Sequence, residues 1–258
     1  MVNLCTPSIE HALTVRLSML RQRRLNIIGD NVANLNTVGF KADRTDFTAL
    51  MYQNHRGALN GEANTQLPMG VGTRVLMTST NFAQGPVQDN QRSLDYMIEG
   101  DGFFALVDLA TGEVSYTRNG AFTMSEYVRS TGRVDEDGQP ITEKIFCLGD
   151  GTGRFVLSEQ GGLIEVTDPT EKLPIGIFDY GNYNGMAQLD DTRYLPVDKN
   201  GNLSYGTGTL RQGILERSNA DLAEELTKVI EAQRAYGIAL KMVQTSDEIE
   251  ATINGLRS

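Results

Sequence analysis

The side chains best suited to chemistry in this chain are two histidines and two cysteines. His11 and His55 have no other His or Cys at the spacing of a metal site, so we expect them to pack or to face solvent. Cys5 and Cys147 lie far apart and form no CxxC pair. They are expected to be small, partly buried apolar side chains rather than a disulfide scaffold. Spacing therefore predicts no metal site and no cofactor.

Glycine-rich and acidic segments give no enzyme motif either. The segment GDGTG (149–153) follows no strand–helix–strand pattern, so a turn is expected rather than a phosphate-binding loop. The segment DKNGN, from Asp198, begins like a calcium loop, but its glycine comes two positions early and Thr209 stands where a bidentate Glu is needed. Carboxylates that are distant in sequence can still meet in a cleft. A β-domain enzyme with helical oligomerisation arms therefore stays open as an alternative.

The balance of charge limits the kinds of partner. The 258-residue chain has a formal net charge of −10 at pH 7, and phosphate backbones need clustered Lys and Arg, so nucleic acid is not expected. The N-terminal segment lacks an apolar run with a small-residue cleavage site, and no window approaches the roughly 18 apolar residues of a membrane span. We expect no membrane insertion, and either a cytoplasmic location or exit without a cleaved signal.

The N-terminal part has the period of an amphipathic helix. Thr6-Pro7 is a good helix start, because a hydroxyl can cap the helix and Pro is tolerated at its first position. We expect a helix over residues 7–35, with apolar residues at near-heptad spacing and one irregular step. This N-terminal seam consists of Leu13, Leu17, Leu20, Leu25, Ile28, Val32 and Leu35.

The C-terminal part shows a more regular heptad pattern. Ser218, with Asp221 three residues later, resembles a capping box and predicts a helix over residues 219–254. Positions repeat at steps of 4 and 3 residues, with the polar Gln233 as one member. The apolar members of this C-terminal seam are Leu222, Leu226, Val229, Tyr236, Leu240 and Val243. Neither seam can bury its side chains alone, so each helix needs a partner.

The middle of the chain has the sequence pattern of an antiparallel β domain. Short β-rich runs such as FFALVD (103–108) alternate with Asn-Gly and Asp-Gly pairs, which favour hairpin turns. The expected fold class is α+β, with terminal helices that pair as an axial coiled-coil domain around an inserted all-β domain. We expect the boundaries 1–40 for the N-terminal helix, 41–75 for an extended linker or hairpin, 76–210 for the β domain and 211–258 for the C-terminal helix.

Three separated segments carry a resemblance to a known family. DNVANLNTVGFKADRTDF (30–47) resembles the first signature of the bacterial flagellar axial proteins, the rod and hook subunits. The segment LERSNADLAEELTKVIEAQRAYGIALKMVQTSDEI (215–249) is similar to the second signature. LDYMIEGDGFFALVD (94–108) and YTRNGAF (116–122) resemble the family's middle motif. The matched signature residues are Asn31, Ala33, Asn34, Asn36, Thr37, Gly39, Phe40, Lys41, Ser218, Asn219, Gln233, Arg234 and Tyr236.

The resemblance implies a structural subunit that polymerises helically through its terminal helices and forms a torque-transmitting drive shaft and the wall of an export channel. It also implies export by the flagellar type III apparatus without a cleaved signal, and a place in the rod outside the cytoplasmic membrane. The expected partners are copies of the chain, other rod and hook proteins, basal-body ring proteins and the export apparatus. Length and FTALMYQ (47–53) are most similar to distal rod subunits, with the proximal rod subunit second.

Two signature features have expected physical roles. Gly39 can adopt a left-handed conformation, and Asn31 and Asn34 can satisfy backbone groups and fix register where the N-terminal helix ends. The resemblance also implies that residues 52–72 form an extended hairpin along neighbouring subunits, whose named residues are Tyr52, Leu59, Asn60, Gly61, Leu67 and Met69. A secreted adhesin or binding module is the remaining alternative of a different class.

Overall fold

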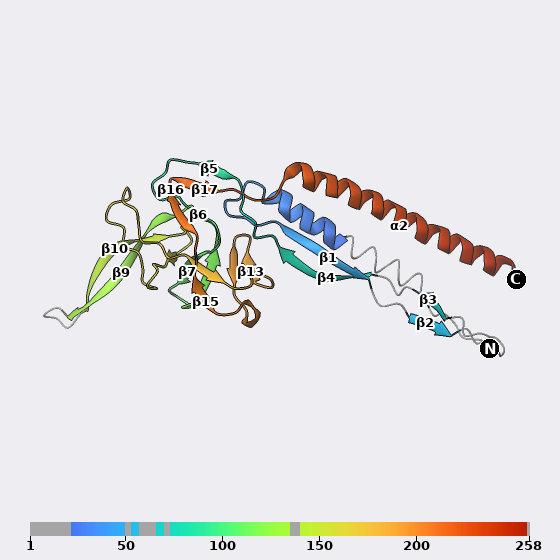
Figure 1. Ribbon diagram of the computed structural model, residues 1–258, viewed down its shortest axis with the longest axis horizontal. Helices are drawn as coiled ribbons and strands as arrows, with labels where there is room; N and C mark the ends of the chain where they lie inside the picture. The colour runs from blue at the N-terminus through green and yellow to red at the C-terminus, as the bar shows by residue number, and fades with distance from the viewer. Residues whose placement is uncertain (1–21, 50–52, 57–65, 70–72, 135–139, 257–258) are drawn as a thin grey trace. The chain divides into compact units, whose positions relative to one another are not determined.

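The computed structural model describes residues 22–49, 53–56, 66–69, 73–134 and 140–256 (Figure 1). These residues fall into two compact units. The helical unit holds the described residues within 1–32, 43–79 and 221–258, and the β unit holds 33–42 and the described residues of 80–220. The chain therefore passes between the units four times, and the β unit is assembled from two separate stretches of sequence.

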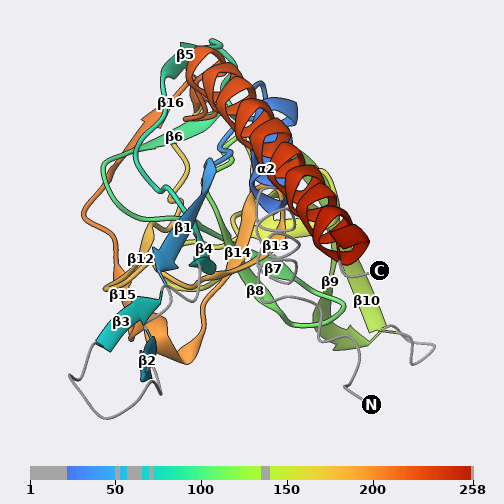
Figure 2. The same ribbon diagram turned by 90° about the vertical axis from the view of Figure 1, so that its right-hand side faces the viewer.

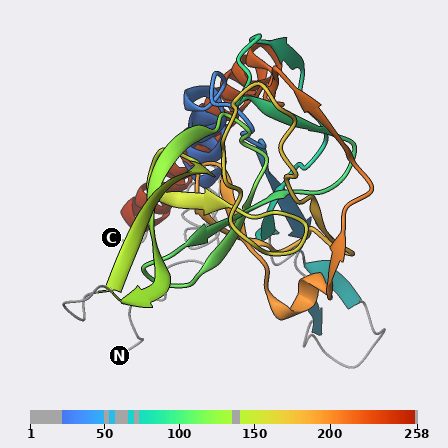
Figure 3. The same cartoon turned by 90° about the vertical axis from the view of Figure 1, so that its left-hand side faces the viewer.

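The β unit is organised around one antiparallel sheet of seven strands. Its strands, in spatial order, are β13 (Ala187–Asp190), β14 (Arg193–Leu195), β8 (Val114–Thr117), β7 (Phe104–Asp108), β11 (Arg154–Val156), β10 (Pro140–Gly149) and β9 (Thr123–Val134). The two long strands β9 and β10, yellow-green in Figure 3, pair from Thr123–Gly149 onward with one register shift near Pro140.

Three smaller antiparallel ladders complete the unit. They pair β12 (Phe178–Tyr180) with β15 (Leu203–Tyr205), β6 (Tyr96–Glu99) with β16 (Thr209–Gln212), and β5 (Val87–Asp89) with β17 (Ile214–Glu216). A short 3-10 turn, η1 (Asp198–Asn200), precedes β15. The mixed α+β class with antiparallel strands, expected from the sequence, is confirmed.

The central strand β7 begins with residues that are buried on both faces of the sheet. Successive side chains of a strand point to opposite faces. Phe104 and Leu106 belong to a cluster with Tyr96, Phe122 and Leu148. Phe103, just before the strand, and Ala105 point the other way and belong to a second cluster, whose other members include Tyr116, Phe178, Tyr180 and Tyr194. The run FFAL is thus continuously apolar because each face of the sheet has its own core.

The turn glycines in this unit serve two different purposes. Gly151, Gly185 and Gly201 have φ between 79° and 90°, the left-handed region expected for glycine in Asp-Gly and Asn-Gly turns. Gly120 follows Asn119 but has no positive φ. A Cβ at Gly120 would lie 1.7 Å from the carbonyl oxygen of Tyr96, so this position needs glycine because two backbone segments touch there.

The helical unit contains a helix over residues 22–33 and one long helix, α2 (Leu222–Leu256), which is continuous in Figure 2. It also contains the antiparallel pairs β1 (Asp43–Ala49) with β4 (Thr73–Thr80) and β2 (Gln53–Arg56) with β3 (Gln66–Met69). Arg24 Nη2 lies 3.9 Å from Glu231 Oε2 of α2. Neither described helix has the length and apolar character needed to cross a membrane.

The start of α2 differs from the sequence expectation. Asp221, not Ser218, caps the helix: its carboxylate accepts a hydrogen bond from Ala223 N at 2.8 Å. Ser218 Oγ instead accepts from Ala220 N at 3.2 Å, before the helix begins. The expected capping box was therefore wrong, since Asp221 stands at the cap position and not three residues inside the helix.

Gly120→Ala tests whether the close backbone contact limits the stability of the β unit. Because the new Cβ would overlap the Tyr96 carbonyl, we expect the free energy of unfolding to fall by about 1–3 kcal/mol or more. Gly181→Ala is the control, since a Cβ there meets nothing within 4 Å and its φ is not in the left-handed region. Urea unfolding followed by circular dichroism measures both. Equal stability of the two variants would show that the contact does not constrain the fold.

Candidate functional site: the junction of the sequence motifs

Residues from all three sequence motifs meet in the β unit. Gly39 N donates to Glu216 O at 2.8 Å, and Asn219 N donates to Phe40 O at 3.4 Å. Gly39 has φ of 71°, which confirms its expected left-handed conformation, and a Cβ there would lie 2.4 Å from Asn119 N. The first signature therefore lies directly against the second signature and against the middle motif. We call this place the motif junction.

A buried group of three charges lies at the centre of the motif junction. Lys41 Nζ is 2.6 Å from Glu216 Oε1, and Arg118 Nη1 is 3.5 Å from Glu216 Oε2. The three side chains are 0%, 1% and 3% exposed for Lys41, Glu216 and Arg118. Each comes from a different motif or its immediate flank, so the charges connect parts of the sequence that are as much as 175 residues apart.

Each charge is also held by groups other than its ionic partner. Lys41 Nζ donates to Ala83 O at 2.8 Å, and Glu216 Oε1 accepts from Gly85 N at 2.7 Å. The two backbone groups belong to the segment that re-enters the β unit at Thr80. The Lys41–Glu216 pair therefore fixes three stretches of chain, because its polar atoms are shared between side-chain and main-chain partners.

Arg118 is held less completely. Its Nη2 donates to Gly100 O at 2.8 Å, and its guanidinium carbon lies 5.4 Å from the centre of the Phe103 ring. Its Nε and Nη1 are buried and have no hydrogen-bond partner among the described residues, although Nη1 is in ion-pair range of Glu216. The guanidinium thus depends on the Glu216 carboxylate for compensation of its charge.

Burial of these charges costs free energy, so each charge needs the opposite charge beside it. Removal from water lowers the pKa of Lys41, while the adjacent Glu216 carboxylate acts in the opposite direction and the Arg118 cation adds to the lowering. A buried ion pair gains little over apolar packing, but a single buried charge without its partner is strongly destabilising. The group is closed to solvent, so it suits a structural lock rather than a reaction with a diffusing substrate.

Asn219 supplies a second tie across the same segments. Its Oδ1 accepts from Ala42 N at 2.7 Å. Its Nδ2 donates to Asn81 O at 2.7 Å and to Ala83 O at 2.9 Å. One amide therefore joins the segment leaving the β unit at residue 42, the segment returning at residue 80 and the segment leaving at residue 220.

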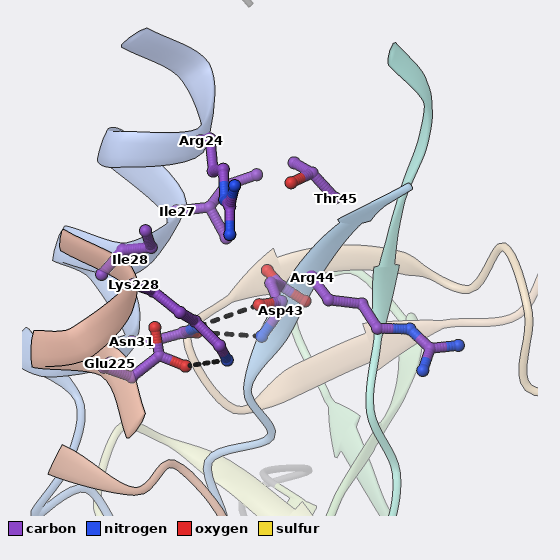
Figure 4. Close-up of a pocket in the computed structure, with 9 residues that line it drawn as sticks. All are labelled: Arg24, Ile27, Ile28, Asn31, Asp43, Arg44, Thr45, Glu225 and Lys228. Carbon is purple, nitrogen blue, oxygen red and sulfur yellow. Dashed lines mark hydrogen bonds and ion pairs between the residues drawn. The ribbon is translucent and has the colours of Figure 1, made fainter. Parts of the chain in front are cut away.

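Asn31 makes a comparable contact inside the helical unit. It is buried, its Oδ1 accepts from Asp43 N at 2.9 Å, and its Nδ2 donates to Asp43 O at 2.8 Å (Figure 4). The side-chain amide thereby replaces a neighbouring strand at the first residue of β1. Asn34 acts differently, since its Oδ1 accepts from the Thr37 hydroxyl at 2.9 Å and shapes the turn.

A pocket of about 210 Å³ adjoins Asn31 (Figure 4). Its lining residues are Arg24, Ile27, Ile28, Asn31, Asp43, Arg44, Thr45, Glu225 and Lys228. Glu225 is buried, and its Oε1 is 2.9 Å from Lys228 Nζ, which also pairs with Glu224 at 2.8 Å. Burial opposes the charge of Lys228, but hydrogen bonds to these carboxylates raise its pKa overall. The pocket is thus lined by charged side chains of both signs, of which Lys228 and Glu225 pair with each other.

The structure brings together only part of the expected residue set. Asn36, Gly39, Phe40, Lys41, Ser218 and Asn219 lie at or beside the motif junction, where Asn36 Oδ1 accepts from Arg217 Nη2 at 3.2 Å. Gln233, Arg234 and Tyr236 lie on α2 in the helical unit. Leu67 and Met69 lie in β3, and Val243 lies in α2. Leu13, Leu17, Leu20, Tyr52, Leu59, Asn60 and Gly61 fall outside the described residues.

Two residues of the buried group escaped the sequence reasoning. Glu216 and Arg118 lie inside two of the sequence motifs, but the motifs did not predict them as site residues. A sequence signal existed, because each charge lies at the end of a β-rich run: Glu216 is the last residue of β17, and Arg118 directly follows β8. A charge at the end of a buried strand needs a partner of opposite charge.

Glu216→Gln removes the shared carboxylate with little change in shape. Lys41 and Arg118 then remain as buried cations, so we expect the free energy of unfolding to fall by about 3–5 kcal/mol. The matched control is Glu143→Gln, because Glu143 pairs with Arg129 at 3.2 Å on the exposed surface and should cost only about 0–1 kcal/mol. Denaturant titration of the full chain measures both, and a small, equal loss in the two variants would contradict the structural role of Glu216.

Comparison with protein families matches the same three parts of the chain. The model described as "Flagella basal body rod protein" matches residues 18–41. The model for the "Flagellar hook protein FlgE/F/G D1 domain" matches residues 97–167, and the "Flagellar basal body rod FlgEFG protein C-terminal" model matches residues 211–256. The first and last matches include Lys41 and Glu216, which meet in the motif junction.

Comparison with individual proteins extends the match over nearly the whole chain. Flagellar basal-body rod protein FlgG of Buchnera aphidicola subsp. Schizaphis graminum is 34% identical over 89% of this chain and 92% of its own length. FlgG of Borreliella burgdorferi is 32% identical, with 92% and 94% coverage. FlgG of Bacillus subtilis is 33% identical, with 88% and 91% coverage. The chain therefore belongs to the family of flagellar basal-body rod proteins, which are structural subunits and not enzymes.

Proposed function

We propose that the chain is the distal rod subunit and that it polymerises helically through its terminal helices. The relatives named FlgG, the distal rod protein, support this placement by matching about nine-tenths of both chains. A second candidate is the proximal rod subunit, since FlgF of Caulobacter vibrioides is 30% identical over 93% of this chain. In either case the polymer would form the drive shaft and the wall of an export channel.

The observation that carries the polymerisation proposal is the apolar surface of α2. Leu222, Leu226, Tyr236 and Leu240 of the expected C-terminal seam are exposed, with Leu226 at 49%. Among the α2 side chains that the structure describes, the buried ones are instead Glu225, Ala232 and Ala239, spaced by seven residues. The exposed seam is thus adjacent on the helix to a stripe that is already covered, and each large apolar side chain gains about 1.5–3 kcal/mol on full burial.

Four residues of the N-terminal seam lie in the part of the chain that the structure describes, and their burial bears on the proposal. Ile28 is buried, while Leu25, Val32 and Leu35 are half-buried. We expect the remaining burial to come from neighbouring subunits, with the two terminal helices pairing as an axial coiled coil. A coiled coil suits a shaft, because its repeated heptad contacts hold the paired helices in one alignment along their length.

The other expected partners follow from the family. We propose contacts with other rod and hook proteins, with the basal-body ring proteins and with the type III export apparatus, and a periplasmic place reached without a cleaved signal. The antiparallel pair β2–β3 spans part of the expected inter-subunit hairpin, with His55 opposite Leu67 and Gln53 opposite Met69. We propose that this hairpin lies along neighbouring subunits and stiffens the rod.

Leu226→Asp tests assembly through the C-terminal seam. A charge at this position should cost about several kcal/mol when a neighbour covers it, so the variant should fold but build no rods. Thr227→Asp is the control, because it adds the same charge one position away, where the Thr227 hydroxyl donates to Ala223 O on the exposed surface. Circular dichroism checks folding, and electron microscopy of purified basal bodies counts rods.

The same micrographs test the distal placement. Labelled wild-type subunit should lie in the part of the rod next to the hook; label at the opposite end would favour the proximal candidate. Normal rods and motility in cells that carry only Leu226→Asp would rule out the seam as an assembly surface.

A further inference from the structure

Asparagine followed by glycine is a reactive pair in proteins. The backbone nitrogen of the glycine can attack the side-chain amide carbon of the asparagine, because glycine has no Cβ to hinder it. The chain contains five such pairs, which begin at Asn60, Asn119, Asn184, Asn200 and Asn254. The structure describes the side chains of three of them, Asn119, Asn184 and Asn200, and these three differ sharply in their surroundings.

Two of the three pairs are held in place. Asn200 is fully buried; its Oδ1 accepts from Val197 N at 2.6 Å and its Nδ2 donates to Asn182 O at 2.7 Å. Asn119 Oδ1 accepts from Ala121 N at 3.0 Å, and the following Gly120 is pressed against the Tyr96 carbonyl. For either pair to react, these contacts must first open, so the folded chain protects them.

The third pair, Asn184-Gly185, lies at an exposed turn. Met186 N donates to Tyr183 O at 3.4 Å across the turn, and Gly185 has φ of 90°. Asn184 and Gly185 are both exposed, and a Cβ at Gly185 would meet nothing within 4 Å. Among the described residues, neither the Asn184 side-chain amide nor the Gly185 nitrogen has a hydrogen-bond partner, whereas Asn184 N donates to Asn182 Oδ1 at 2.9 Å. Both reacting groups are therefore free.

We propose that Asn184 is a site of spontaneous deamidation in the folded protein. Hydroxide removes the proton from the Gly185 nitrogen, which then bonds to Asn184 Cγ; the Cγ–Nδ2 bond breaks and ammonia leaves with a proton from water. Water next hydrolyses the cyclic imide at either carbonyl, giving aspartate or isoaspartate. No oxidation or reduction takes place, and water and hydroxide are the only co-reactants.

The neighbours of the turn give the modification a structural consequence. Tyr183 and Met186 pack against the second core cluster, and Tyr183 also contacts the rings of Phe82 and Phe103 with centroids at 5.4 Å and 5.3 Å. An isoaspartate at position 184 lengthens the backbone between these two anchors by one carbon. The modified chain should therefore lose stability, whereas conversion to ordinary aspartate adds only an exposed charge.

Peptide mapping of the aged protein tests this proposal. The full chain is incubated in mildly alkaline buffer, digested at mildly acidic pH and examined by mass spectrometry with chromatography that resolves isoaspartate. In the folded chain, Asn184 should convert at least about tenfold faster than Asn119 and Asn200, whose contacts must open first. In urea, where the contacts are absent, the three rates should converge. Equal rates in the folded chain, or an Asn184 that reacts only in urea, would overturn the proposal.

Gly185→Asp is the matched variant. Asp tolerates the left-handed region better than most residues, and space for its side chain is open, so the turn should persist. Its Cβ hinders the attacking nitrogen, so conversion of Asn184 should slow by about tenfold or more. Because a side chain is strained at this φ of 90°, the fresh variant should fold but melt at a somewhat lower temperature. An undiminished rate in this variant would show that the loss of ammonia follows another route.

Discussion

Burying a charged side chain away from water costs free energy, and this cost is the constraint on which the structure of the β unit depends. Lys41, Glu216 and Arg118 are almost completely buried, so each must be compensated inside the β unit. Their partners come from every segment by which the chain passes between its two units: residues 33–42, the stretch after Thr80 and the stretch before Ala220. The charges can be satisfied only when all of these segments lie in register. Asn219 imposes the same condition with hydrogen bonds alone, through Ala42, Asn81 and Ala83.

This constraint separates two roles within the signature motifs. Gly39, Lys41 and Asn219 serve the fold, because their contacts are internal, short and buried or half-buried. The seam residues of α2 have the opposite character, since Leu226 and Leu240 are exposed and apolar. The contacts that hold the β unit together do not use these exposed side chains of α2. The signature residues that close the β unit are therefore different from the apolar residues that α2 exposes.

Local sequence predicted the parts of the fold that local forces determine. Heptad spacing indicated α2, the Asp-Gly and Asn-Gly pairs indicated turns, and the left-handed Gly39 was expected. Contacts between distant segments were not predictable in the same way. Nothing in the spacing of Glu216 indicates Lys41, 175 residues away, and the resemblance named Lys41 without its partner. The sequence assigned the cap of α2 to Ser218 rather than to Asp221, because both residue types cap helices well and their spacing alone does not show where the helix begins.

A double-mutant cycle between Lys41 and Glu216 measures the dependence of the two charges most directly. The free energy of unfolding is determined for the full chain, for Lys41→Met, for Glu216→Gln and for the double variant. If each charge is needed mainly to compensate the other, the losses should be far from additive, with a coupling energy near the upper end of about 0.5–3 kcal/mol. Losses that add to within about 0.3–0.5 kcal/mol would show that the pair is not a shared lock, and the motif junction would then need another source of its stability.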